Sequence, residues 1–350
     1  MKSKVRNLFQ VAALGLSIVF MVSGCGQASK PETKPAATAA TTAPKASFPE
    51  KPITLMVMGA PGGSTDLLAR AVEKVWPKFS KADILVVNKA GAGGVEGANF
   101  VAKAKPDGYT LLLGYGSGND IVMPFLDGAS MPYKPLEDLV AVSRLSIHSV
   151  VVEVPANSPY KSVADVVAWS KKENKPITAA VSTTAGAVDI VMRGIGKITG
   201  TTVTPIPHQG GSQAIATLLG GNTVIGGNHP AEVMPQIKSG KLRAIGVALD
   251  KRELLGDLKD VPTLKEQGID FYTWGSVKGI AAPKGTPKEI VTTLDDIFKK
   301  ISVDPDFIKQ MDTTFMPVNY QGADDFAKFM VQASADYKKL IGELGLAPKK

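Results

Sequence analysis

A short loop rich in glycine and hydroxyl residues is the feature of this sequence best suited to bind an anion. Residues 60–66 read Ala-Pro-Gly-Gly-Ser-Thr-Asp and follow the apolar segment 53–57. Glycines leave backbone N–H groups uncovered, and a helix that begins at this loop would add the positive end of its dipole. The loop therefore predicts a carboxylate or phosphate site, with an ordinary strand-to-helix turn carrying an acid in the first helical turn as the alternative. The candidate ligand contacts are Gly62, Gly63, Ser64 and Asp66.

A second loop of the same kind follows another apolar segment. Residues 182–186 read Ser-Thr-Thr-Ala-Gly and come directly after the apolar residues 177–181. By itself such a loop is more simply explained as a Ser/Thr-rich helix cap. Two loops that each end a strand would face one another, however, if two lobes share a cleft. The candidate ligand contacts here are Ser182, Thr183, Thr184 and Gly186.

Other chemistries find less support. The glycine-rich residues 91–97 carry Glu96 where a dinucleotide-binding loop requires its third glycine, and no Walker loop or Gly-x-Ser-x-Gly nucleophile elbow is present. The three histidines, His148, His208 and His229, match no short metal-binding spacing, which favours structural or surface roles. The net charge of +8 comes from scattered basic residues without a block of like charge. We therefore expect no metal, no cofactor and no nucleic-acid partner.

The N-terminus resembles a bacterial lipoprotein signal. Three basic residues precede an apolar run that ends at Val22, and Ser23 and Gly24 lead into Cys25, the single cysteine of the chain. The run is too short for a comfortable membrane-spanning helix of about 20 residues. We expect residues 1–24 to be a signal peptide and Cys25 to carry lipid that holds the protein at a membrane surface. A plain secretory signal and an N-terminal anchor helix are the alternatives.

The remaining chain alternates apolar segments with helical patterns. Residues 25–47 are mostly Ala, Thr, Pro and Lys, which predicts a disordered tether. Strands are expected at 53–57, 84–87, 109–113, 150–154, 177–181, 203–205, 223–226 and 244–248, and late helices at 287–302 and 324–344. Strands that alternate with helices predict mainly parallel sheets. Roughly 300 residues suffice for two α/β domains with sizeable cores.

Seven short motifs in order resemble the substrate-binding proteins of tripartite tricarboxylate transporters, the Bug family of extracytoplasmic solute receptors. The resemblance covers nearly the full length, and no single motif carries it. The motifs lie at residues 51–66, 88–94, 106–111, 209–211 with 218–221, 240–244, 260–264 and 282–287.

The resemblance implies a two-lobed Venus-flytrap fold of the type II-like periplasmic-binding-protein class, in which the chain crosses between lobes twice. Lobe 1 would comprise residues 48–150 and 270–350, and lobe 2 residues 151–269. The family grips a ligand carboxylate largely through backbone groups, small hydroxyls and ordered water, and closure traps the ligand without catalysis. Carried onto this sequence, the resemblance adds Ser117, Gly210 and Gly211 to the site. It also implies integral membrane transporter subunits as partners, with a sensor kinase as the alternative partner, and we expect a monomer.

Four residues depart from the family pattern. Met58 and Gly59 stand where the family usually has Pro-Phe before the first loop, which removes an aromatic wall of the pocket and enlarges it. Asp189 stands where many members have a histidine, so it either caps or leaves the site, or pairs with an ammonium or amide group of the ligand. His208 replaces a tyrosine and is a further candidate at the rim of the pocket, with packing as the alternative.

Two other function classes compete with the receptor. The same loops would serve a secreted enzyme as an oxyanion or phosphate site, although no nucleophile and base are paired in the sequence. A surface adhesion or scaffold protein would bind no small molecule at all. Chemically unchanged ligand recovered after binding would separate the receptor from the enzyme.

Overall fold

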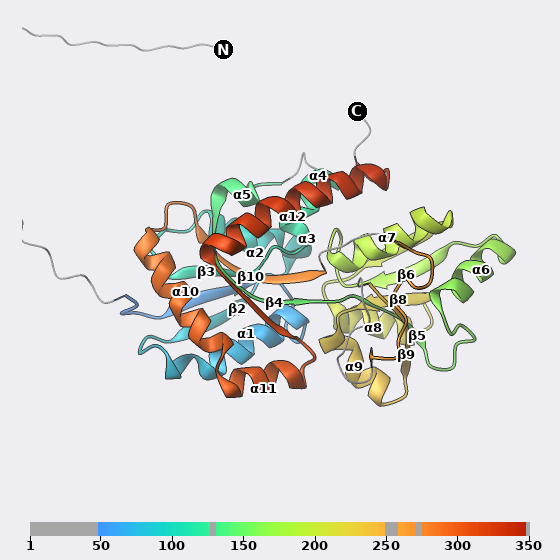
Figure 1. The fold of residues 1–350 in the computed structure, drawn as a ribbon, viewed down its shortest axis with the longest axis horizontal. Helices are drawn as coiled ribbons and strands as arrows, with labels where there is room; N and C mark the ends of the chain where they lie inside the picture. The colour runs from blue at the N-terminus through green and yellow to red at the C-terminus, as the bar shows by residue number, and fades with distance from the viewer. Residues whose placement is uncertain (1–47, 127–130, 249–257, 271–274, 348–350) are drawn as a thin grey trace, which may run out of the picture. The chain divides into compact units, whose positions relative to one another are not determined.

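The computed structural model describes residues 48–126, 131–248, 258–270 and 275–347 (Figure 1). The expected signal peptide, lipid attachment at Cys25 and tether lie outside these residues. Two separate sheets organise the described part of the chain, and each is covered by helices on both faces. We call each sheet with its helices a lobe.

The first lobe is built on a six-stranded mixed sheet. Its strand order is β11-β4-β10-β3-β1-β2, with β1, β2 and β3 parallel and the other three joined by antiparallel pairing. Successive residues of β1 point to opposite faces, so Leu55 packs in one core cluster and Met56 in the other. The strands are β1 (Ile53–Val57), β2 (Ile84–Asn88), β3 (Thr110–Tyr115), β4 (Leu139–His148), β10 (Ser276–Pro283) and β11 (Val318–Gly322).

Helices cover both faces of this sheet. Apolar residues of α1 and α10 pack with Leu55 on one face, and apolar residues of α2 and α12 pack with Met56 on the other. The helices are α1 (Ser64–Val75), α2 (Val95–Ala102), α3 (Gly118–Ile121), α4 (Met123–Leu126), α5 (Pro135–Asp138), α10 (Lys288–Ser302), α11 (Pro305–Thr313) and α12 (Ala323–Glu343), with short 3₁₀ turns η1 (Trp76–Lys78) and η2 (Gly91–Gly94).

The second lobe is built on a five-stranded mixed sheet. Its strand order is β7-β6-β8-β5-β9; β6 pairs in parallel with β7 and β8, whereas β5 is antiparallel to both of its neighbours. Helices α6 and α7 pack on one face, and α8 and α9 on the other. The elements are β5 (Val151–Pro155), α6 (Val163–Glu173), β6 (Ile177–Val181), α7 (Ala187–Thr199), β7 (Val203–Pro207), α8 (Gly211–Leu219), β8 (Ile225–Asn228), α9 (Pro230–Lys238) and β9 (Leu242–Val247).

The chain passes between the two lobes at the ends of β4 and β10. Strand β4 ends at His148 in the first sheet, and β5 begins at Val151 in the second. The chain is back in the first sheet when β10 begins at Ser276. Figure 1 shows the lobes side by side, joined where these strands lie. Loops at the ends of strands from both lobes therefore meet between them.

The structure confirms the expected two-lobed α/β fold and adds antiparallel strands that the sequence did not predict. The predicted parallel strands form the core of each sheet, while β4, β10 and β11 extend the first sheet in antiparallel fashion. Within the ranges given above, no helix is both long and apolar enough to cross a membrane.

Candidate functional site

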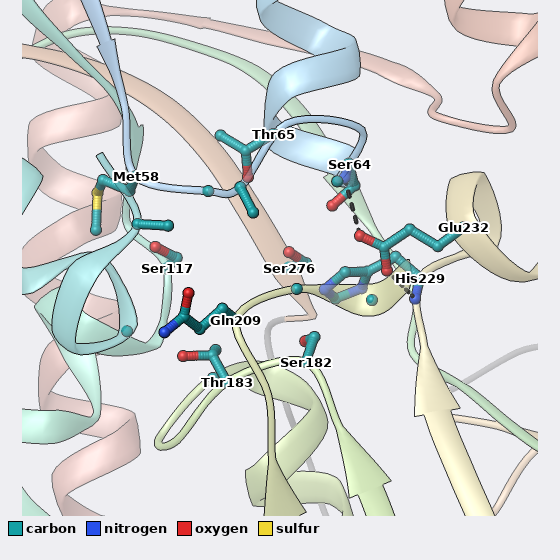
Figure 2. A pocket seen from close by; sticks show the side chains of 18 of the residues that line it. Met58, Ser64, Thr65, Ser117, Ser182, Thr183, Gln209, His229, Glu232 and Ser276 are labelled. Carbon is teal, nitrogen blue, oxygen red and sulfur yellow. Dashed lines mark hydrogen bonds between the residues drawn. The ribbon is translucent and has the colours of Figure 1, made fainter. Parts of the chain in front are cut away.

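A pocket of about 110 Å³ lies where loops of both lobes meet (Figure 2). Its wall comes from residues that follow β1, β2, β3, β6, β7 and β8, together with the beginning of β10. In the close-up, Ser182 and Thr183 of the second lobe lie opposite Ser64 and Thr65 of the first. A pocket of this size suits a small metabolite.

Five helices begin at this pocket. Helices α1 and α3 of the first lobe and α7, α8 and α9 of the second each contribute residues at or next to their N-cap to the wall. The first turn of a helix has N–H groups without an intrahelical partner and carries the positive end of the dipole. The described wall therefore presents a concentration of partial positive charge. The N-cap residues are Gly63, Ser117, Gly186, Gly210 and His229.

Four of these helix starts share one local hydrogen bond. The third residue of the helix turns its side-chain oxygen back to accept from the N–H just before the N-cap, which fixes the loop. The donor and acceptor pairs are Gly62 N with Asp66 Oδ2 at 2.8 Å, Gly116 N with Asp120 Oδ2 at 2.9 Å, Ala185 N with Asp189 Oδ2 at 2.7 Å, and Gln209 N with Gln213 Oε1 at 3.2 Å.

This arrangement places two acids of the predicted site, Asp66 and Asp189, outside the pocket wall. Asp66 is occupied by Gly62 N–H, Arg70 and Asn88, and Asp189 by Ala185 N–H and by Arg193 Nε at 2.9 Å; neither lines the pocket. Burial raises the pKa of Asp189, and the adjacent guanidinium of Arg193 opposes that rise. Both carboxylates anchor a binding loop from behind. For Asp189 the structure favours the capping alternative.

The other predicted residues divide between the wall and its surroundings. Gly62 and Thr184 do not line the pocket, because the loops turn them outward; both are exposed. The Ser117 hydroxyl reaches the wall but donates to Gly114 O at 2.6 Å. The residues that line the pocket as predicted are Gly63, Ser64, Ser117, Ser182, Thr183, Gly186, Gly210 and Gly211.

Lys278 is a pocket residue that sequence reasoning missed. It lies in β10, is 4% exposed, and donates from Nζ to Thr65 Oγ1 at 2.8 Å. Burial lowers the pKa of Lys278 to about 8, and the negative charge of Glu232 opposes this decrease. A full positive charge on the pocket wall can pair with a ligand anion directly.

Glu232 is a second pocket residue that was missed. It belongs to α9 of the second lobe, yet its Oε1 accepts from Ser64 N in the first lobe at 2.9 Å. Its Oε2 accepts from His229 N at 3.2 Å (Figure 2). The pocket thus contains one acid that joins the two lobes.

Burial favours the neutral form of two histidines near the pocket, His148 and His229. Burial lowers the pKa of His229 to about 4. Burial also lowers the pKa of His148 well below its usual range, and the nearby His229 and Lys278 add to this decrease. The His208 Nδ1 lies 3.2 Å from Val181 O and its Nε2 lies 2.7 Å from Thr217 Oγ1. Because a carbonyl can only accept, Nδ1 of His208 donates to Val181 O. His208 and Met58 both line the pocket, the latter in place of the aromatic wall.

A metal site finds no support in the described residues. Within them, no three side chains of His, Cys, Asp or Glu come together in a way that could hold a metal ion. The chemistry of the pocket is instead that of hydrogen-bond donors, one ammonium and one carboxylate. Such a set binds an anion and offers no activated nucleophile.

Comparisons with known proteins agree on one family. Residues 68–346 match the family model for the tripartite tricarboxylate transporter family receptor. A curated protein of Cupriavidus necator, described as a UPF0065 protein in the gbd 5' region, is 32% identical over 306 residues, which are 86% of this chain and 89% of that protein.

Solved structures share the fold over the same length. One described as a periplasmic transporter is 30% identical with a TM-score of 0.76, and it covers 86% of this chain and 99% of its own. The protein Rpa4515 of R. palustris, solved with adipate, is 24% identical with a TM-score of 0.79 over 86% of this chain and 100% of its own. These similarities extend over both lobes.

Proposed function

This chain belongs to the tripartite tricarboxylate transporter receptor family, and from that premise we propose that it captures a small carboxylate in the pocket between its lobes. The family is one of periplasmic solute receptors, so the protein is a binding protein and not an enzyme. The captured acid would then be delivered to integral membrane transporter subunits.

The observation that carries the proposal is the combination of Lys278 with the converging helix N-termini. An ammonium and converging helix N-termini stabilise a carboxylate, and the anchoring acids Asp66 and Asp189 face away from it. The adipate-bound relative also supports an acid as the ligand. The predicted contacts that line the pocket would surround the acid: Gly63, Ser64, Ser182, Thr183, Gly186, Gly210 and Gly211.

Binding to a small acid is tested by isothermal titration of the purified protein, freed of ligand, against a panel of carboxylates and amino acids. At least one acid is expected to bind, and Ser182→Trp, which fills the pocket from the second lobe, should abolish its binding. Ser239→Trp on the exposed end of α9 is the matched control. If no acid binds or raises the melting temperature, the proposal fails.

We further propose that the receptor is anchored by lipid at Cys25, so that it remains next to its transporter after secretion. The support is the sequence alone: a basic start, a short apolar run and Ser23-Gly24-Cys25. Wild type should be recovered with membranes and incorporate labelled fatty acid, whereas Cys25→Ala should do neither. If wild type and Cys25→Ala fractionate in the same way, the proposed lipid anchor is excluded, and the proposed binding function is unaffected. A sensor kinase in place of the transporter stays the alternative partner.

A further inference from the structure

Glu232 lies at the N-termini of three helices, of which α9 is its own and is closed by the usual capping-box bond from the N-cap N–H to the third residue. Its carboxylate accepts from Ser64 N, the first residue of α1, and from His229 N, the N-cap of α9. It also lies against Gly211, the first residue of α8. Helix N-termini are where an anionic ligand group would be expected to bind. Here a carboxylate of the protein itself occupies that position (Figure 2).

The surrounding residues leave room for this carboxylate. A Cβ added at Gly211 would lie 2.3 Å from Glu232 Oε2 and 2.8 Å from Asn228 Oδ1, so a side chain there would force Glu232 away. At Gly63 an added Cβ would lie 3.7 Å from Glu232 Oε1. The 3.7 Å at Gly63 is an ordinary contact, so Gly211 is the glycine that the carboxylate of Glu232 requires. This is a built position for Glu232 and not a surface side chain that happens to point inward.

The opposite charge in the pocket is supplied by Lys278. Among the described residues its Nζ has one hydrogen bond, to Thr65 Oγ1, and an ammonium has three N–H donors. A ligand carboxylate can therefore pair with Lys278. The pocket then has a positive pole at Lys278 and a negative pole at Glu232.

We propose that Glu232 determines ligand specificity: the pocket selects a small acid with a single carboxylate and a hydrogen-bond donor at its other end, and rejects a second carboxylate. The inference rests on the proposed function, since it assumes that a carboxylate is bound. A second carboxylate would meet Glu232 as a like charge in a partly buried place, whereas an amide, hydroxyl or ammonium group would donate to it.

The test compares three four-carbon acids that differ at one end only. Succinate carries a second carboxylate there, succinamate a neutral amide of the same shape, and 4-aminobutyrate an ammonium. The same comparison with glutarate, glutaramate and 5-aminopentanoate covers a longer ligand. Dissociation constants are measured by isothermal titration for the wild-type protein, for Glu232→Gln and for Glu289→Gln. Glu289 is an exposed acid in the first turn of α10, so its replacement removes the same charge away from the pocket.

Glu232→Gln is chosen because its amide oxygen still accepts from Ser64 N and preserves the bond between the lobes. Wild type is expected to bind one of the donor-ended acids at least about tenfold more tightly than the matched dicarboxylate. Glu232→Gln should reduce that preference at least about tenfold, and Glu289→Gln should leave it unchanged. Which donor-ended acid binds more tightly distinguishes a neutral from a cationic group.

The outcomes separate this inference from the function on which it rests. Acids that bind with the same preference in wild type and Glu232→Gln would overturn the role of Glu232 while the carboxylate receptor stands. If no acid binds either protein, the receptor function and this inference fail together. If Glu232→Gln does not fold, the wild-type ranking decides, because tighter binding of a dicarboxylate than of its amide contradicts the proposal.

Discussion

The ammonium group of Lys278 is buried, so its protonation depends on the charges of neighbouring groups. Burial lowers its pKa to about 8, within reach of ordinary buffers. A bound carboxylate favours the charged form, so ligand binding and protonation of Lys278 support each other. We predict that affinity for an acid is constant below about pH 7 and falls above pH 8, approaching tenfold per pH unit when the charged form is required. Titration calorimetry from pH 6 to 9.5 measures this.

Lys278→Met isolates the contribution of that charge. The apolar side chain fills a similar volume, and affinity at pH 7 should fall by about 2 kcal/mol or more, roughly thirtyfold. The decline above pH 8 should disappear with the ammonium. Lys284→Met removes an exposed lysine just beyond the same strand and should change neither property. A pH profile that persists in Lys278→Met would assign the titration to another group.

The buried acid Glu153 is expected to make the stability of the protein depend on pH. It is fully buried in β5, its Oε1 accepts from Asn228 Nδ2, and its Oε2 has no hydrogen-bond partner among the described residues. Burial raises its pKa to about 8, so between its ordinary value and pH 8 the folded state binds more protons than the unfolded state. Stability contributed by this group therefore decreases as the pH rises through that window.

Glu153→Gln should remove this decrease and stabilise the protein at pH 8. The amide keeps an acceptor for Asn228 and does not ionise, so the variant should gain about 1 kcal/mol or more over wild type at pH 8 and little at pH 5. Urea unfolding at the two pH values gives the difference. Equal gains at both would mean that packing, and not ionisation, is responsible.

At the scale of helices, the recurrent side-chain oxygen at the third helical position explains how the binding loops keep their shape. Asp189 of α7 fixes the loop that carries Ser182 and Thr183 through Ala185 N–H, and Arg193 holds the same carboxylate. Asp165 makes the equivalent bonds at the start of α6, to Lys161 N and Ser162 N, but α6 does not line the pocket. Asp189 therefore anchors a loop that lines the pocket, whereas Asp165 anchors a loop that does not.

Asp189→Ala is predicted to weaken both folding and ligand binding. A buried N–H and Arg193 lose their acceptor, which costs about 2–3 kcal/mol of stability, and the loosened loop should lower affinity for the acid. Asp165→Ala should cost stability only. Urea unfolding and titration calorimetry on both variants separate the effects. Unchanged affinity in Asp189→Ala would show that the loop needs no anchor, and it would also exclude contact between Asp189 and the ligand.

Elements whose apolar residues form a continuous run were predictable, and elements with buried polar residues were not. The segments at β1, β3 and β6 are mostly apolar, with one threonine each, and lead into glycine or hydroxyl loops, so both the strands and most pocket residues could be predicted. Strand β4 includes Ser143, Arg144 and Ser146, and β10 includes Lys278, all buried. The hydrogen-bond partners of these polar side chains lie far away in the sequence, so no local sequence pattern contains them.

The charged residues of the pocket escaped prediction for the same reason. Lys278 meets Thr65 across 213 positions of sequence, and Glu232 meets Ser64 across 168. Asp66 and Asp189 were predicted as contacts because they lie in the right loops, but local hydrogen bonds turn them away from the pocket. Sequence position identifies a loop, whereas the side-chain direction depends on which hydrogen bonds the folded chain offers.

At the scale of the whole described body, the two lobes touch on both sides of the pocket. Glu232 accepts from Ser64 N at one side. At the other, the backbone of α3 in the first lobe approaches Ala185 and Gly186 of the second so closely that only glycine fits at position 118. These contacts describe a closed arrangement, and the crossing between β4 and β5 is the short link about which the lobes can separate.

Gly118→Ala should therefore weaken ligand binding by preventing full closure. The added Cβ would lie 1.8 Å from Ala185 O and 2.6 Å from Gly186 Cα, and both are backbone atoms that cannot move aside without shifting the lobe. Each lobe keeps its own core, so the variant should fold, while affinity for the acid should fall at least about tenfold. Small-angle scattering should show a smaller decrease in radius of gyration on adding saturating ligand than in wild type. Gly342→Ala, in α12 where an added Cβ meets no atom within 4 Å, should leave affinity and compaction unchanged. Wild-type affinity in Gly118→Ala would mean that the ligand is held without this contact between the lobes.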